Sequence, residues 1–168
     1  MPTDFANAQS SDAKTIPVID VSGAISGDGI NSVADAIYAA AINHGFFYIS
    51  NLGIDPILME QAFAVSKAFF ELPEGDKHAV AVDRNQRGWL AKGMSQMQGS
   101  KTHDLKEVFF WGPHTEADDV DMLARKPLCA VNQWPRDFPR LSEDLTPYYD
   151  AVCLMARRVM AAVAVSLD

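Results

Sequence analysis

Residues 44–54 read His-Gly-Phe-Phe-Tyr-Ile-Ser-Asn-Leu-Gly-Ile, and they contain the strongest strand signal in the chain. The run from Phe46 to Ser50 is dominated by aromatic and β-branched side chains, which favour a β-strand. Asn51-Leu52-Gly53 closes the run with residues that favour turns. The stretch therefore predicts a strand, and helical patterns flank it on both sides.

Three helices are predicted from the spacing of apolar residues. The first covers Ile30–Ala41 and ends near His44-Gly45. The second opens at Asp55-Pro56, an N-cap followed by a first-turn proline, and its apolar stripe runs to Phe69. The third, of about 25 residues, follows the spacing of Leu145–Val163 and reaches the end of the sequence without a Gly or Pro stop.

The other predicted strands are short, and loops separate them. Ile16–Val21 has a proline near its start, which suits a first or edge strand, and Val108–Trp111 is a second short strand. Three short strands rarely form a free-standing sheet. The pattern therefore predicts an α+β domain over residues 16–168 from which part of the fold is missing. The remaining segments are predicted to be a frayed polar tail at residues 1–15 and loops at 22–31, 75–107 and 114–140.

Composition limits the kinds of partner. The chain has 168 residues and a formal net charge of −8. Nucleic acid and anionic membranes reward positive charge, so neither is expected as a partner. No apolar run suits a signal peptide or a membrane span. The two cysteines, Cys129 and Cys153, lie far apart. These features favour the reducing cytoplasm.

The histidines do not predict a metal site. Iron oxygenases hold their metal with two His and one carboxylate. Of the four histidines, only His114 has a carboxylate two residues on, at Glu116, and no later histidine completes a triad. Asp118, Asp119 and Asp121 lack the Gly and distal Glu of a calcium loop, which favours a solvated turn. We therefore expect no metal ligand and no catalytic residue in this chain.

Arg87 and Trp89 are the candidates for substrate binding. They flank Gly88 in a polar segment, residues 84–103, which we expect on the surface, where loops carry function. Gly88 permits a turn that would aim both neighbours into a pocket. The Arg87 guanidinium suits a substrate carboxylate, and an arginine on the surface or paired with a nearby Asp is an equally good alternative. Trp89 suits a pocket wall, and its alternative is a core position.

Several segments, in order, resemble the N-terminal region of the isopenicillin N synthase-like family of iron(II)/2-oxoglutarate oxygenases. They are Ile16–Asp20, residues 44–54, Phe69–Pro73, Arg87-Gly88-Trp89, Asp104–Phe109, Asn132–Pro135 and Tyr148-Tyr149. The order and spacing of these segments make the resemblance specific. One departure is Leu52, where the family commonly has a histidine that is not an iron ligand.

The resemblance implies a non-haem iron(II)/2-oxoglutarate-type dioxygenase that oxidises a small organic substrate. In the family, the N-terminal helices and short strands pack against a double-stranded β-helix, or jelly roll. That barrel carries the iron ligands, His-x-Asp and a later His, and the Arg-x-Ser that holds 2-oxoglutarate. The resemblance thus implies that Fe(II) and 2-oxoglutarate bind the intact enzyme, that the 168-residue chain alone binds neither and is inactive, and that its partner is the C-terminal catalytic barrel. Some relatives do not use 2-oxoglutarate, so the cosubstrate stays open.

A second hypothesis is a non-catalytic binding or interaction module that functions at this length. It would expose the long helix and bind a partner through the stripe of Val152, Val159 and Val163. The reading frame beyond codon 168 discriminates the two hypotheses, because an oxygenase needs His-x-Asp and a later His downstream.

Overall fold

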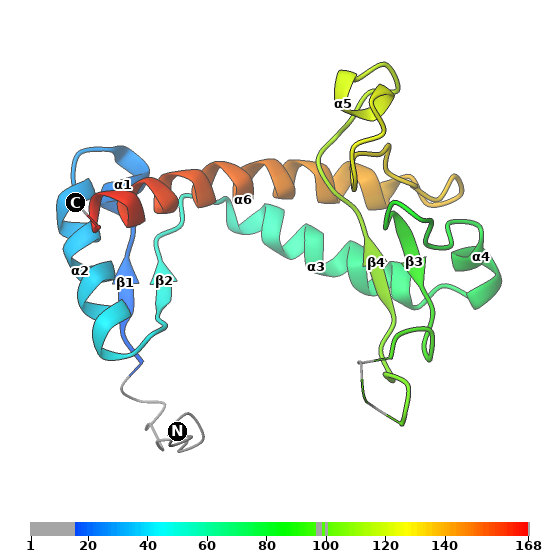
Figure 1. Cartoon of the computed structure of the whole chain (residues 1–168), viewed down its shortest axis with the longest axis horizontal. Coiled ribbons are helices and arrows are strands. Elements are labelled where there is room, and N and C mark those ends of the chain that lie inside the picture. The colour runs from blue at the N-terminus through cyan, green and yellow to red at the C-terminus, as the bar shows by residue number, and fades with distance from the viewer. Residues whose placement is uncertain (1–15, 97–98, 100, 168) are drawn as a thin grey trace. The chain divides into compact units, whose positions relative to one another are not determined.

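The computed structural model describes residues 16–96, 99 and 101–167, which form two units. The first unit contains the chain up to Pro56 and again from Tyr148 onward, and the second contains Ile57–Pro147. Figure 1 labels the helices and strands. The tail predicted at residues 1–15 lies outside the described residues.

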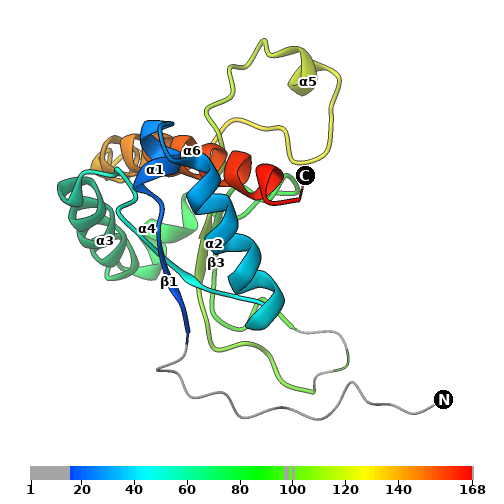
Figure 2. The ribbon, with the colours of Figure 1, turned by 90° about the vertical axis from the view of Figure 1, so that its left-hand side faces the viewer.

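The first unit is a parallel strand pair with a helical crossover. It contains β1 (Val18–Asp20), α1 (Ser22–Ser26), α2 (Ile30–Asn43), β2 (Tyr48–Ser50) and the C-terminal part of α6 (Arg140–Val165). Val18 pairs with Tyr48 and Asp20 with Ser50. Parallel strands need a crossover connection, which α1 and α2 supply, as Figures 1 and 2 show.

The core of this unit is built from small and β-branched residues. Helical spacing places Val33, Ile37 and Ala40 of α2 on one buried face, against Ile19 of β1. Ala162, near the end of α6, is fully buried in the same cluster. The opposite face of the strand pair is open, because Val18 is 64% exposed and Tyr48 is 62% exposed.

The second unit joins helices to an antiparallel strand pair. It contains α3 (Pro56–Phe70), α4 (Glu74–His78), β3 (Gly88–Leu90), β4 (Val108–Phe110), α5 (Val120–Leu123) and the first turns of α6. Gly88 pairs with Phe110 and Leu90 with Val108. The fully buried ring of Phe69 on α3 meets the ring of Phe109 edge-on at 4.8 Å, which packs the helix against β4.

The helices predicted from periodicity are confirmed, and the predicted loops are wrong in part. The long helix begins at Arg140 rather than Leu145. Each expected loop contains a short element: α1 within residues 22–31, α4 and β3 within 75–107, and α5 within 114–140. These elements have three to five residues and are held by partners that lie outside them, so no local periodicity marks them. For example, the Asp20 carboxylate accepts a hydrogen bond from Ser22 N, at 2.9 Å, at the start of α1.

Within the described residues, no helix has the length and apolar character needed to cross a membrane.

Candidate functional site

Trp89 lies in the interior of the second unit. Its side chain is on β3 and only 2% of it is exposed. The indole N–H donates to Oε2 of Glu107 at 2.7 Å. The His78 ring meets the indole edge-on, with the ring centroids 5.0 Å apart. Trp89 is therefore a hydrogen-bonded core residue of this chain.

Lys77 is buried and forms an ion pair with the half-buried Glu107 beside the indole. The Lys77 Nζ lies 2.8 Å from Glu107 Oε2, donates to the carbonyl of Phe70 at 2.9 Å, and lies 5.1 Å from the Trp89 ring centre. Burial alone would raise the pKa of the Glu107 carboxyl. The hydrogen bonds from Lys77 and Trp89, with the charge of Lys77, outweigh burial and lower that pKa. Removing Glu107 would leave the buried Lys77 ammonium without a counter-charge, and such a change costs about 3–5 kcal/mol in buried pairs.

Arg87 is buried too, with 7% of its surface exposed. Its guanidinium donates to backbone carbonyls: NH2 to Leu128 at 2.8 Å, and NH1 to Asn85 at 3.3 Å and to Gln86 at 3.2 Å. Its Nε is buried without a hydrogen-bond partner in the described structure. Arg87 thus ties residues 85–86 to the distant segment around Leu128.

Two glycines make room for this arrangement. Gly88 has φ +107°, and a Cβ there would collide with the carbonyl oxygen of Val80. At Gly112, a Cβ would come within 2.7 Å of Arg87 NH2. Gly88 therefore permits both the backbone turn and the close approach that bury its two neighbours.

Residues 132–135, Asn-Gln-Trp-Pro, support the same region. The Asn132 side chain accepts from Gly112 N at 2.9 Å and donates to Gly112 O at 2.8 Å. Gln133 Nε2 donates to the carbonyl of Arg87 at 2.7 Å. The Trp134 ring lies 5.7 Å from the ring of Phe109. Each of the three side chains thus fixes a neighbouring strand end or loop.

The expectation that residues 84–103 lie on the surface is wrong at Arg87 and Trp89. Both side chains have partners distant in sequence, Leu128 and Glu107, and these partners make their burial possible. Substrate contact by either residue stays a prediction. Sequence reasoning missed Lys77, which was assigned to a polar loop. Glu107 lies in the Asp-Leu-Lys-Glu run, residues 104–107, which marked the region without revealing the ion pair.

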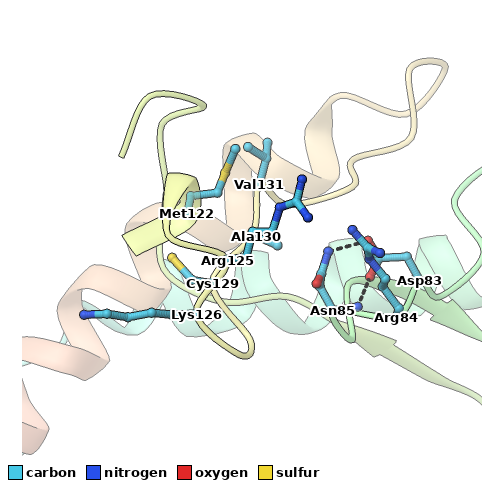
Figure 3. Close-up of a pocket in the computed structure, with 9 residues that line it drawn as sticks. All are labelled: Asp83, Arg84, Asn85, Met122, Arg125, Lys126, Cys129, Ala130 and Val131. Carbon is cyan, nitrogen blue, oxygen red and sulfur yellow. Dashed lines mark hydrogen bonds between the residues drawn. The ribbon is translucent and has the colours of Figure 1, made fainter. Parts of the chain in front are cut away.

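A cleft next to Arg87 has three basic side chains among the nine residues that line it. Its volume is about 600 Å³, and its two walls come from residues 83–85 and from Met122, Arg125, Lys126 and residues 129–131 (Figure 3). Arg84, Arg125 and Lys126 contribute three positive charges, against one negative charge from Asp83. We call this hollow the basic cleft.

His114 and the acidic cluster of residues 118–121 make only local contacts in the described structure. His114 and Glu116 form an exposed pair at 2.8 Å. Asp119 caps α5 by accepting from Asp121 N and Met122 N, while Asp121 pairs with Lys126 at 2.6 Å. In the portion of the chain with described coordinates, no three His, Cys, Asp or Glu residues gather as a metal site.

The chain matches a known family over most of its length. The model of the family described as non-haem dioxygenase in morphine synthesis, N-terminal, matches residues 16–137. A 2-oxoglutarate-Fe(II) type oxidoreductase of Aspergillus fumigatus is 31% identical over 76% of this chain and 39% of its own length. A 2-oxoglutarate-dependent dioxygenase of Penicillium crustosum is 30% identical over 99% of this chain and 53% of its own. The chain thus spans about half, or less, of these relatives.

Solved structures with a similar fold come from the same kind of protein. A 2OG-Fe(II) oxygenase family protein from Caulobacter crescentus has a TM-score of 0.75 and 25% identity, over 91% of this chain and 48% of that one. A full-length Neurospora crassa protein in complex with alpha-KG has a TM-score of 0.70 and 28% identity, over 90% of this chain and 46% of that one.

Proposed function

The chain belongs to the non-haem dioxygenase N-terminal family. On that premise, we propose that it is the N-terminal part of an iron(II)/2-oxoglutarate-dependent oxygenase that oxidises a small organic substrate. The match over residues 16–137 carries this proposal. It is supported by relatives named as 2-oxoglutarate-dependent dioxygenases and by a similar structure bound to alpha-KG. Fe(II) and 2-oxoglutarate are the proposed cofactors of the intact enzyme.

The proposed domain organisation is an N-terminal domain, residues 16–168, that packs against a jelly-roll catalytic barrel. The open face of the strand pair β1–β2 supports this proposal, because Val18 and Tyr48 are register partners with exposed apolar side chains. A sheet normally buries its apolar face against another layer. A barrel of the same protein would supply that layer and so is the proposed partner.

The described residues do not fit iron, because no group of His, Cys, Asp or Glu side chains forms a ligand set among them. These residues can instead hold neighbouring strands and loops in place. The Lys77–Glu107 pair and Trp89 fix β3 against β4, and Arg87 joins the two walls of the basic cleft. We propose that Arg87 and Trp89 contribute to substrate binding in this way, by holding the walls of a pocket.

A cytoplasmic location is proposed from the acidic composition and the free thiols of Cys129 and Cys153.

The reading frame that follows codon 168 tests the proposal. An open frame with His-x-Asp and a later His supports it, because those residues supply the iron ligands. A native stop codon, with a monodisperse 168-residue product, would instead support the non-catalytic interaction module.

A further inference from the structure

The basic cleft has the size and construction of a small-molecule site. Its volume of about 600 Å³ falls within the range of ligand pockets. Its walls mix charged side chains with the apolar side chains of Met122, Ala130 and Val131. Non-glycine residues with positive φ lie in or next to the walls: Arg125 lines the cleft, and Gln86 and Leu128 belong to the same two loops, with φ between +53° and +63°. Such residues often gather at ligand clamps.

Two guanidinium groups in the cleft have no partner among the described residues. Within the described structure, the side chains of Arg84 and Arg125 make neither a hydrogen bond nor an ion pair. Lys126 differs, since Asp121 holds it at 2.6 Å. In Figure 3 Lys126 extends away from both arginines, which come from the two different walls. The free positive charge of the cleft is therefore that of the arginines.

Asp83 also lines the cleft, but it forms no ion pair with either arginine in the described structure. One carboxylate oxygen accepts from Asn85 N at 2.9 Å and from Arg87 N at 3.0 Å, and the other accepts from Asn85 Nδ2 at 3.3 Å. These bonds hold the Asp83 carboxylate to its own loop. With Lys126 paired to Asp121, the residues that line the cleft keep two arginines against Asp83, and this small positive excess, in a chain that carries −8, favours anions.

Arg87 adds a buried charge next to this hollow. Its guanidinium bonds to carbonyls of both walls, at Asn85 and Leu128, and no carboxylate pairs with it among the described residues. A buried cation without a counter-charge is costly, and its Nε is also left without a partner. An anion in the adjacent cleft would offset part of that cost by Coulomb attraction.

We propose that the basic cleft binds a small organic oxyanion, held by the guanidinium groups of Arg84 and Arg125. Guanidinium groups bind carboxylate and phosphate oxygens in bidentate geometry, and the apolar residues of the wall would contact the carbon skeleton. The proposal rests on the second unit alone and does not depend on the oxygenase assignment.

Titration of the isotope-labelled 168-residue chain with succinate and with inorganic phosphate, followed by amide chemical shifts at constant ionic strength, tests the proposal. We expect saturable shifts confined to residues 83–87 and 122–131. Arg84→Gln and Arg125→Gln should each weaken binding at least tenfold, which is about 1.4 kcal/mol. Arg158→Gln is the matched control, because it removes the same charge from an exposed position on α6, and it should leave the affinity unchanged.

The two probes identify the source of the oxyanion. Tighter binding of succinate assigns a carboxylate ligand, and tighter binding of phosphate assigns a phosphorylated one. Shifts that do not saturate, or that spread over basic residues outside the cleft, would overturn the proposal, and so would an equal loss in Arg158→Gln. The shift map of the unmodified chain decides the question even if a variant fails to fold.

Discussion

Replacing Trp89 with alanine should strongly destabilise this chain. The side chain is 2% exposed, so its removal leaves a cavity that the surrounding structure fills only partly. Truncation of a buried tryptophan costs about 3–5 kcal/mol. The indole N–H also donates to the charged carboxylate of Glu107 at 2.7 Å. Trp89→Phe keeps most of the ring but loses this bond, which should cost about 1.5–3 kcal/mol.

Urea denaturation followed by far-UV circular dichroism measures these losses in the 168-residue chain. Phe63→Ala is the control, because Phe63 is also a large aromatic residue but is 77% exposed, and its loss should stay within about 0.5 kcal/mol. The loss of unfolding free energy should be largest for Trp89→Ala, smaller for Trp89→Phe and smallest for Phe63→Ala. A loss below about 1 kcal/mol for Trp89→Ala, or equal losses for the two Trp89 variants, would refute the reasoning about burial and the hydrogen bond.

Three further predictions concern the pH dependence of stability, the conformation at Gly88 and the exposed apolar face of the strand pair. The pKa of Glu107 is lower in the folded chain than its ordinary value of 4.5, so its stabilisation is complete above that value and is lost as pH falls through the folded pKa. Glu107→Gln should therefore flatten the fall in unfolding free energy as the pH drops below 4.5, and an unchanged slope would count against the ion pair. Gly88→Ala should cost at least about 1 kcal/mol because of its positive φ and the crowded Cβ site. Gly75→Ala, with nothing within 4 Å, is its control, and similar unfolding free energies for the two variants would be inconsistent with this account. The chain should bind a hydrophobic dye or self-associate through faces such as Val18 with Tyr48; a monomer that binds no dye would contradict this.

Periodicity predicted the elements that carry their own pattern. The apolar spacing of α2 and α3 depends only on residues within each helix, so their positions were predictable from the sequence. Strand β3 has three residues, and its ladder partner lies about twenty positions away, at Val108–Phe110. No local signal reports such a pairing.

The candidate site was also predictable from the sequence only in part. The Arg-Gly-Trp segment was singled out by its residue types, and the structure puts it at the centre of a hydrogen-bonded region. Its burial was not predictable, because it depends on Glu107, 18 residues away, and on Leu128, 41 residues away. Lys77 was missed for the same reason: a lysine in a polar stretch is normally solvated, and here its pairing with Glu107 and its bond to the Phe70 carbonyl make burial tolerable.

Succinate release from 2-oxoglutarate tests the central claim most directly. The assay compares the product of the complete gene that encodes these residues with the 168-residue chain, each with Fe(II) and with a chelated control. We predict iron-dependent succinate release by the complete product and none above the chelated control by the 168-residue chain, which lacks a ligand set among its described residues. Iron-dependent release by the 168-residue chain alone, or no release by the complete product, would contradict the assignment.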